Sequence, residues 1–454
     1  MSNQTADVVV IGMGPGGEDV AGRLAEAGLD VVGIDWELVG GECPYWGCIP
    51  SKMMIRAAHL LAEARRIPGM AGDATVTPDW APVAQRIRDE ATDDWDDTVA
   101  VERFEGKGGR FIRGTGQITG PREVTVGDQV ITAQSGIVVA SGTSAAIPPI
   151  GGLRDVDFWT NREAIEAEEL PASLAVLGGG AIGVELAQSF ARFGTTVTII
   201  EALDRLVPAE EPEAGALLAE VFCDEGIDVR AGISVTGVSA AGDGVRIELG
   251  DGDTIEAARL LVATGRRADL ATVGLGAAGI DDTQRWVPVD EHQRVADGIC
   301  AVGDITGKGA FTHVAMYQSA IAVADILGQE HPPAQYRALP RATFTDPEIG
   351  SVGQTEDQAR EAGVAVAVGS TKVPHTARGW LHKAGNDGFI KLVADSDRDV
   401  LVGATAMGPN GGEVLGLLTL AVHAEIPIPT LRQMIYAYPT FHKGVEDALG
   451  RLPA

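Results

Sequence analysis

The chain is poor in cysteine, in aromatic residues and in basic residues. It has only four cysteines among 454 residues, which excludes a small secreted fold held by disulfides. Its first apolar run, Val8–Ile11, has no basic segment before it and is too short for the apolar part of a signal peptide. No apolar stretch reaches the roughly 20 residues that a membrane span needs. These absences predict a cytoplasmic protein that does not enter a membrane.

The charge balance excludes another class of partner. Thirty-five basic residues stand against 64 acidic ones, a formal net charge of −29. Nucleic acid and anionic membranes are therefore poor partners. We interpret the acidity as a solubility feature. Because the overall charge is so negative, an anionic cofactor must be held by local N–H groups and a few cations.

Glycine and hydrophobic residues, in contrast, are abundant. The 59 glycines and the hydrophobic content of 45% are typical of an α/β protein with many tight strand–helix turns. A chain of 454 residues is long enough for about three domains, each with its own core.

A complete dinucleotide-binding pattern opens the chain. An apolar strand, Asp7–Ile11, runs into Gly12, Gly14 and Gly17 in G-x-G-x-x-G spacing, and a helical pattern follows. The next strand, Val31–Ile34, ends in Asp35. Such glycines let the backbone approach a pyrophosphate at a helix N-terminus, and the acid can bond ribose hydroxyls.

The same pattern recurs in the middle of the chain. Leu174–Leu177 leads into Gly178, Gly180 and Gly183, and the strand Val197–Ile200 ends in Glu201. Two such units imply two dinucleotides. An acid at this place favours a free ribose 2′-hydroxyl and hence NADH, while nearby Arg205 keeps NADPH possible.

Three further segments each contain the end of a predicted strand. Val139–Thr143 and Val262–Arg266 break into turns at Gly142 and Gly265, and Ile299–Asp304 is a buried strand that ends in an acid. Asp304 suits a helix N-cap and also a cofactor hydroxyl. We interpret Cys300 and Cys223 as packing residues.

The segment Gly40–Lys52 carries the remaining two cysteines, Cys43 and Cys48. A helix start with Pro50 in its first turn places Cys48 near a helix N-terminus, which favours a thiolate, and Lys52 follows one turn later. The pattern predicts a reactive dithiol. A stabilising disulfide is uncommon inside cells, and half of a zinc site lacks a second Cys/His pair at ligand spacing, so we expect no metal.

After a Pro-containing linker at 332–340 the chain changes character. Four strands, Ala342–Phe344, Val364–Val368, Phe389–Val393 and Leu401–Ala406, and two helices, Glu413–Ala424 and Thr430–Met434, predict a separate α+β domain. Within the first domain we expect Ile87–Glu105 to be a polar helical excursion with Asp93–Asp97 as its solvated face.

Together these motifs resemble the FAD-dependent pyridine nucleotide–disulfide oxidoreductases, which include dihydrolipoamide dehydrogenase, mercuric reductase, glutathione reductase and soluble transhydrogenase. The segment Phe344–Gly350 resembles the opening of that family's dimer-interface domain, and the likeness covers essentially the whole chain. It implies two Rossmann-like domains and a C-terminal α+β dimerisation domain. The segments would be 1–150 and 273–335 for FAD, 151–272 for NAD(P)H and 336–454 for homodimerisation.

The resemblance also implies a role for each motif residue. FAD would lie on the first glycine turn and Gly142, with Asp35 on the adenosine ribose and Asp304 on the ribityl chain. NAD(P)H would lie on the second turn, Glu201 and Gly265, and reduce the flavin. Cys48 would face the flavin, Cys43 would meet the substrate disulfide, and Lys52 would pair with Glu185 beside the flavin ring, where such a pair stabilises negative charge on the reduced ring.

The C-terminal segment departs from the family pattern. The thiol reductases carry His-Pro-Thr with a glutamate five residues after the histidine, whereas this chain has Tyr438 and Lys443 at those two positions. A phenol with a pKa near ~10 is a poor base at neutral pH. Three interpretations remain open: Tyr438 acts as an acid, His442 takes the proton role, or the acceptor is not a simple dithiol. Tyr438 as mere interface packing is a fourth.

Two relatives share part of this departure. Soluble transhydrogenases carry Tyr-Pro-Thr but lack the cysteine pair, and mercuric reductases carry the tyrosine but add a C-terminal cysteine pair, which the final residues Gly450–Ala454 do not contain. The leading hypothesis is an NAD(P)H-driven disulfide reductase, similar to dihydrolipoamide dehydrogenase, that uses FAD. The alternatives are electron transfer to quinones, metal ions or a second nicotinamide, and a non-catalytic flavin redox sensor.

Overall fold

The computed structural model describes residues 2–453, and the chain divides into two compact units. The first unit comprises the residues through Pro50 together with Gln85–Ala146 and Gly265–Gln335. The second comprises Ser51–Ala84, Ile147–Thr264 and the residues from Tyr336 onward. The division into four domain segments given above stays a prediction.

The first unit is built on an eight-stranded sheet. Six strands run in the order β16-β17-β6-β1-β2-β3, and β5 joins β6 to β4. The pairs β17–β6, β6–β1, β1–β2 and β2–β3 are parallel. The strands are β1 (Ser2–Ile11), β2 (Val31–Asp35), β3 (Arg110–Arg113), β4 (Gln117–Gly120), β5 (Glu123–Val126), β6 (Gln129–Val139), β16 (Arg294–Ala296) and β17 (Ile299–Ala301).

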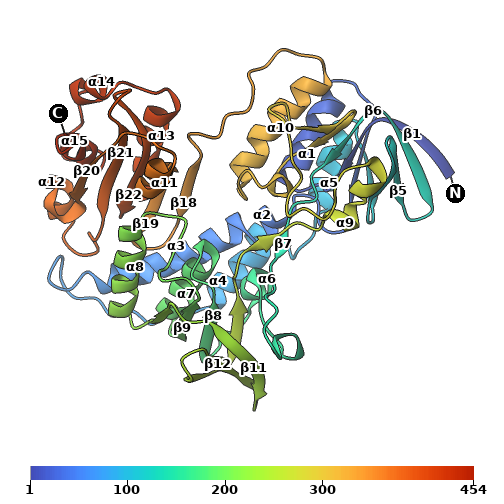
Figure 1. The fold of residues 1–454 in the computed structure, drawn as a ribbon. Coiled ribbons are helices and arrows are strands. Elements are labelled where there is room, and N and C mark those ends of the chain that lie inside the picture. The colour runs from blue at the N-terminus through green and yellow to red at the C-terminus, as the bar shows by residue number, and fades with distance from the viewer. Residues whose placement is uncertain (1, 454) are drawn as a thin grey trace. The chain divides into compact units, whose positions relative to one another are not determined.

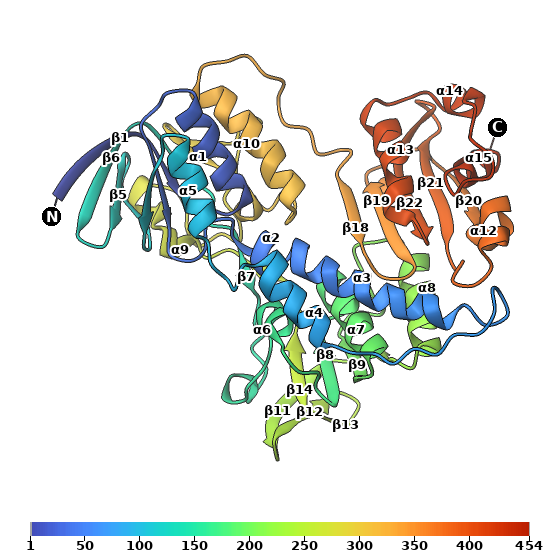
Figure 2. The same ribbon diagram turned by 180° about the vertical axis from the view of Figure 1, so that it is seen from behind.

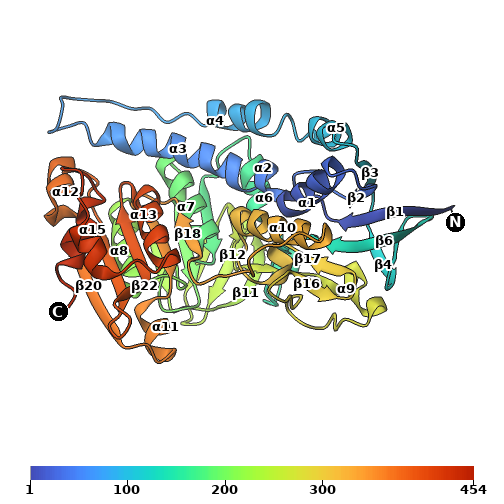
Figure 3. The same cartoon turned by 90° about the horizontal axis from the view of Figure 1, so that it is seen from above.

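Both faces of this sheet are covered, which explains the nearly continuous apolar run of β1. Val8 and Val10 pack with α1 (Pro15–Glu26), α5 (Thr98–Gly106) and α10 (Thr312–Ile326), and α1 and α10 lie side by side (Figures 1 and 3). Val9 and Ile11 face the opposite way, onto a cluster that includes Ile118 and Leu270. Parallel strands buried on both faces need such continuous apolar sequence.

Shorter elements complete the first unit. They are α2 (Glu42–Tyr45), α9 (Leu270–Val273), a π-helical turn (Ile87–Ala91), 3-10 turns at Leu275–Ala278 and Asp304–Thr306, and the two-residue strands β7 (Ser144–Ala145) and β15 (Arg266–Arg267).

The second unit holds another parallel sheet, in the order β10-β9-β8-β14. Its strands β8 (Ser173–Leu177), β9 (Thr196–Glu201) and β14 (Arg259–Val262) pack apolar side chains onto a small antiparallel sheet of β11 (Val235–Ala241), β12 (Gly244–Leu249) and β13 (Thr254–Ala257). The remaining elements here are β10 (Asp228–Ala231), α6 (Asn161–Glu166), α7 (Ala181–Phe193), α8 (Pro212–Asp224) and a 3-10 turn at Leu153–Asp155. The chain passes from the first unit to the second within helix α3 (Cys48–Arg65). It returns to the first unit within helix α4 (Ala81–Arg86).

The last part of the second unit is an antiparallel sheet in the order β18-β19-β22-β21-β20, with α13 packed on it (Figure 2). Its core takes side chains from the sheet and from α13, α14 and α15. The elements are β18 (Pro340–Thr343), β19 (Glu348–Gly353), α11 (Glu356–Glu361), β20 (Val366–Lys372), a 3-10 turn (Val373–His375), α12 (Ala377–His382), β21 (Phe389–Asp395), β22 (Val400–Gly408), α13 (Gly411–His423), α14 (Ile428–Gln433) and α15 (Lys443–Leu449).

One sequence interpretation is only partly right at this level, and another is wrong. In the acidic stretch 93–97, Asp93, Asp94 and Asp96 are exposed as expected, but the stretch is a turn rather than a helix, and Asp97 is buried. Its carboxylate accepts from the backbone N–H of Val39 and from Arg113. Cys223, interpreted as packing, is exposed on α8, because the buried face of that helix carries Leu218 and Phe222 instead.

Candidate functional site

The first glycine turn has three glycines that are required for different reasons. Gly12 has φ +93°, and a Cβ there would lie 2.4 Å from the carbonyl oxygen of Ala140. A Cβ at Gly17 would lie 1.9 Å from the oxygen of Gly12. A Cβ at Gly14, the N-cap of α1, would have the Cα of Gly41 as its nearest neighbour, at 4.0 Å. The outer glycines serve packing, and the open space at Gly14 fits a pyrophosphate against the exposed N–H groups of α1.

Asp35 lies at the end of β2 beside this turn. Its Oδ2 accepts from the backbone N–H of Met13 at 2.6 Å, and its Oδ1 accepts from Glu37 at 2.9 Å. Burial raises its pKa, against the lowering effect of these two hydrogen bonds. The carboxylate is therefore fixed in orientation, as an acceptor for ribose hydroxyls must be.

The predicted dithiol lies at the junction of two helices. Cys43 belongs to α2, and Cys48 is the first residue of α3, as the sequence predicted. The two side chains are thiols rather than a disulfide, and the Cys48 sulfur lies 3.4 Å from the hydroxyl oxygen of Thr312 at the start of α10. A hydrogen bond to Cys48 raises the pKa of the Cys43 thiol well above its usual range, and burial adds to the effect. Cys43 thus keeps its proton, while Cys48 has the helix N-terminus that favours a thiolate.

Arg266 connects the dithiol loop to Asp304. Its guanidinium lies 2.9 Å from the Glu42 carboxylate and donates to the side-chain and backbone oxygens of Thr143 at 2.7 and 2.6 Å. The Thr143 hydroxyl in turn donates to Asp304 at 2.8 Å, and burial raises the pKa of that acid. Gly142, with φ +64°, turns the chain just before this network.

The second glycine turn repeats the first. A Cβ at Gly178 would lie 2.4 Å from the oxygen of Ala263, and one at Gly183 would lie 2.0 Å from the oxygen of Gly178. Among the described residues, no atom outside its chain neighbours comes within 4 Å of a Cβ at Gly180, the N-cap of α7. Glu201 accepts from the backbone N–H groups of Gly179 and Leu203 at 2.6 and 2.8 Å. This turn also fits a dinucleotide.

Lys52 and Glu185 form the contact that the family resemblance implied. Lys52 Nζ lies 2.8 Å from Glu185 Oε2, and the other carboxylate oxygen accepts from the backbone N–H of Phe344 at 2.8 Å. The ammonium also lies 4.8 Å from the centre of the Phe344 ring. Glu185 is buried, so its charge is compensated by this ion pair and hydrogen bond.

The C-terminal segment holds the residues that replace the histidine–glutamate pair. Tyr438 is 71% exposed, and the His442 ring nitrogen Nε2 lies 3.4 Å from the hydroxyl of Thr440. Glu446 is paired with Lys443 rather than with Tyr438 or His442. In the described chain, therefore, no carboxylate is recorded that orients either candidate proton donor.

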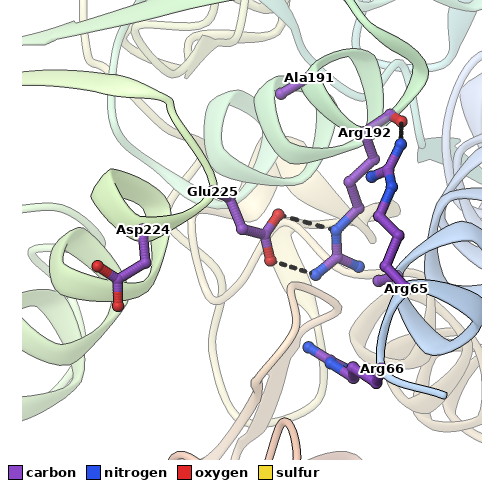
Figure 4. A pocket seen from close by; sticks show the side chains of 7 residues that line it. Arg65, Arg66, Ala191, Arg192, Asp224 and Glu225 are labelled. Atoms are coloured by element: carbon purple, nitrogen blue, oxygen red, sulfur yellow. Dashed lines mark hydrogen bonds and ion pairs between the residues drawn. The ribbon is translucent and has the colours of Figure 1, made fainter. Parts of the chain in front are cut away.

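A cavity of about 360 Å³ lies elsewhere in the second unit. It is lined by Ala62, Arg65, Arg66, Ala191, Arg192, Asp224 and Glu225, which stand outside all the motifs above. Arg192 donates to Glu225 through two nitrogens, and Arg65 donates to the Arg192 carbonyl at 2.8 Å (Figure 4). Buried Arg192 also lies 2.8 Å from Asp346. Because Arg192 is paired with Glu225 and Asp346, and Arg66 is paired with Asp346, we interpret this cluster as structural.

Three residues of the site were missed from the sequence. Arg266 stands directly after the Gly265 turn, Thr312 opens α10, and Phe344 directly follows β18. The position of Arg266 next to a strand-ending glycine was a usable signal. Thr312 lies 264 residues beyond Cys48, and no local pattern reports such a contact.

The described fold and its two glycine turns define a class, that of proteins with two dinucleotide sites and a redox dithiol. Comparison with known proteins agrees. Residues 6–319 match the family described as pyridine nucleotide-disulphide oxidoreductase, and residues 339–449 match the dimerisation domain of that family. The chain belongs to the pyridine nucleotide–disulphide oxidoreductases.

Individual relatives match over nearly the whole length. A dihydrolipoyl dehydrogenase of Thermus scotoductus is 33% identical, over 98% of this chain and 97% of the relative. A mercuric reductase of Staphylococcus aureus is 31% identical, over 97% of this chain and 81% of the relative. The HOCl-induced flavoprotein disulfide reductase RclA of Escherichia coli, solved as a Cu(II) complex, is 26% identical with a TM-score of 0.86, over 98% and 99% of the two chains.

These findings confirm the general predictions. The protein is a flavoprotein oxidoreductase that acts on sulfur groups, uses FAD and NAD(P)H, and carries a dimerisation domain that supports a homodimer. In the described part of the chain no helix is long and apolar enough to cross a bilayer.

Proposed function

We propose that this protein is an NADH-dependent reductase of disulfides in which Cys43 and Cys48 carry the electrons to the acceptor. The observation that supports it best is the Cys43–Cys48 pair, with Cys48 at a helix N-terminus and Cys43 hydrogen-bonded to it. Bound FAD would supply the two-electron link between nicotinamide and dithiol. The first glycine turn, Asp35, Gly142 and Asp304 would hold FAD, and the second turn, Glu201 and Gly265 would hold NADH.

The dithiol step balances with the groups present. Cys43 loses its proton to water and, as a thiolate, attacks one sulfur of the acceptor disulfide, which releases the first thiol product. Cys48 then attacks Cys43, which releases the second thiol and leaves a Cys43–Cys48 disulfide. The acceptor is reduced by two electrons and the dithiol is oxidised by two. Because the pKa of Cys43 is raised, forming its thiolate is the costly part of this sequence.

The proton for the first leaving thiol would come from the C-terminal segment of a partner subunit. The family resemblance places Tyr438 and His442 there, and the exposure of Tyr438 suits a residue that completes a site on another chain. Tyr438 can donate its phenolic proton to a departing thiolate, but it cannot act as an efficient base near neutral pH. We therefore expect reduction of disulfides to run better than oxidation of dithiols such as dihydrolipoamide.

A second candidate acceptor is a thiophilic metal ion. The replacement of the histidine by Tyr438 favours it, because a metal ion bound by two thiolates leaves without taking a proton. The mercuric reductase relative and the Cu(II) complex of the structural relative point in the same direction.

One acceptor screen tests both candidates. NADH oxidation is measured with a small disulfide, a quinone, Hg(II) and Cu(II), using wild type, Cys43→Ser, Cys48→Ser and, as a matched control, Cys223→Ser. We expect Cys43→Ser to lose at least 100-fold in disulfide turnover, and Cys223→Ser to keep it. Disulfide turnover that survives both Cys43→Ser and Cys48→Ser would overturn the proposal. If these two substitutions abolish turnover with metal ions but not with disulfides, the second candidate is favoured.

A further inference from the structure

A second group of metal-binding side chains lies in the first unit, on residues that none of the motifs contains. His292 lies in the turn before β16, Asp325 lies at the end of α10, and His331 lies in the segment that follows that helix. One ligand atom from each residue lies within 4.8 Å of those of the other two. Three segments of the chain thus bring two imidazoles and a carboxylate to one point.

One nitrogen atom of the His292 ring faces one nitrogen atom of the His331 ring. His292 Nδ1 lies 3.4 Å from His331 Nε2. The other nitrogen of each ring faces an oxygen: His331 Nδ1 lies 2.6 Å from the carbonyl oxygen of Pro332, and His292 Nε2 lies 3.7 Å from Glu291 Oε1. The Pro332 carbonyl keeps the N–H of His331 on Nδ1 and leaves a lone pair on Nε2, the nitrogen that faces His292.

A cation held between His292 Nδ1 and His331 Nε2 would be stabilised by this lone pair. A metal-bound histidine usually donates its second N–H to a carbonyl or a carboxylate, which is the arrangement of His331 here. Tetrahedral Zn²⁺ with Zn–N bonds of about 2.0–2.1 Å separates its nitrogen ligands by about 3.3 Å. The observed 3.4 Å between the nitrogens therefore fits one metal ion.

Asp325 supplies the third ligand and is already oriented. Arg294 binds both carboxylate oxygens from one side, which leaves further lone pairs on each oxygen. The Asp325 side chain is only 14% exposed. Glu291, which lies beside His292, and Glu330, which lines the same cavity, add negative charge nearby.

An open side completes the arrangement. A cavity of about 740 Å³ is lined by His292, Arg294, Asp325, Glu330 and His331 among others, and it has room for water as a fourth ligand. The segment that carries His331 is also held nearby, because Ala334 donates its N–H to the Glu291 carbonyl at 2.8 Å.

We propose that His292, Asp325 and His331 form a binding site for a divalent transition-metal ion of the Zn²⁺ class. Imidazole nitrogens suit Zn²⁺, Cu²⁺ and Ni²⁺, whereas Mg²⁺ and Ca²⁺ prefer oxygen alone. The ion would tie the turn before β16, the end of α10 and the segment after it together. The site shares no residue with the dithiol or with either glycine turn.

Zn²⁺ is the test probe, with the FAD-loaded Cys43→Ser/Cys48→Ser protein as the background so that metal does not bind to the dithiol. Competition with a chromophoric chelator gives stoichiometry and affinity, and the d–d spectrum of bound Co²⁺ reports its ligand geometry. The background is compared with two additional substitutions, His331→Gln and, as the matched control, His375→Gln, an exposed histidine on another element. Far-UV circular dichroism and flavin content check that each variant is folded.

We expect one ion per chain in the background and in His375→Gln, a tetrahedral Co²⁺ spectrum, and at least tenfold weaker binding in His331→Gln. Absence of Zn²⁺ binding in the background would overturn the proposal. Equal binding by folded His331→Gln would overturn it as well, because the ion would then be held elsewhere.

Discussion

The guanidinium of Arg266 lies 2.9 Å from the carboxylate of Glu42, the residue directly before Cys43. The same guanidinium holds Thr143, whose hydroxyl holds Asp304. One side chain thus links the dithiol loop to the acid expected on the flavin ribityl chain.

Replacing Arg266 is therefore expected to affect both stability and flavin retention. In Arg266→Met the carboxylates of Glu42 and Asp304, both largely buried, lose their cation, and the free energy of unfolding should fall by about 1–3 kcal/mol. FAD should bind at least tenfold more weakly. Urea unfolding and flavin fluorescence measure the two effects.

Arg246→Met is the control for this change. Arg246 pairs with Glu256 on the surface, with side chains 52% and 61% exposed, so its loss should change stability by less than about 1 kcal/mol. If Arg266→Met behaves like Arg246→Met, the network has no role in holding the loop.

The second glycine turn offers a pair of substitutions that separates binding from folding. Gly180 has φ −76° and open space at its Cβ, so Gly180→Ala should fold normally and raise the KM for NADH at least tenfold by filling the pyrophosphate site. In Gly183→Ala the new Cβ would meet the Gly178 oxygen at 2.0 Å, and the melting temperature should fall. Steady-state kinetics and thermal melts distinguish the two. An unchanged KM for NADH in Gly180→Ala would show that the nucleotide does not bind at this turn.

The pH dependence of disulfide reduction follows from the raised pKa of Cys43. The attacking species is the thiolate, and a raised pKa makes it scarce at neutral pH. The second-order rate constant of the pre-reduced enzyme with a small disulfide should therefore keep rising from pH 7 to pH 9. Stopped-flow measurement of thiol release tests this. A rate constant that stays constant over this range would contradict the prediction.

The sequence predicted the parts of this protein that depend on local pattern. Both glycine turns, the acids Asp35 and Glu201, and the helix that starts at Cys48 were found because each combines a strand, a turn and a helix within about 30 residues. The strands of the C-terminal domain were also found, apart from β19.

The rest depends on contacts between distant segments. The sheet of β11–β13 was missed because its half-exposed strands lack a strong apolar run. Asp97 stands in an acidic stretch that looks solvated, and only the fold shows that it caps Val39 and binds Arg113. Lys52 and Glu185 were paired through family resemblance, because nothing in their own neighbourhoods joins residues 133 apart.

The Lys52–Glu185 ion pair should control electron entry if it lies beside the flavin, as the family resemblance implies. Glu185→Gln keeps an oxygen for the Phe344 N–H but removes the charge that holds Lys52. We expect reduction of the bound flavin by NADH to slow at least tenfold, with a shifted flavin potential, while NADH still binds. Glu63→Gln is the control, because Glu63 is an exposed residue of the same helix α3 that pairs with Arg66 directly after the helix. Wild-type reduction rates in Glu185→Gln would contradict this role.

Acid stability should report on His59, which is packed beside Arg192 and Asp346. Burial, reinforced by the charge of Arg192, lowers the pKa of His59 to about 4, and its Nε2 has no hydrogen-bond partner recorded among the described residues. Arg66 and Arg56 act in the same direction, while Asp346 opposes them. The unfolded chain binds the proton near pH 6.5, so this contribution is complete above pH 6.5 and is lost as the pH falls toward 4. The loss amounts to about 3 kcal/mol. His59→Leu should therefore flatten the decline in urea midpoint between pH 7 and pH 4.5, whereas the exposed His375→Leu should decline as the wild type does. Parallel curves for His59→Leu and wild type would show that His59 takes up its proton without cost to the fold.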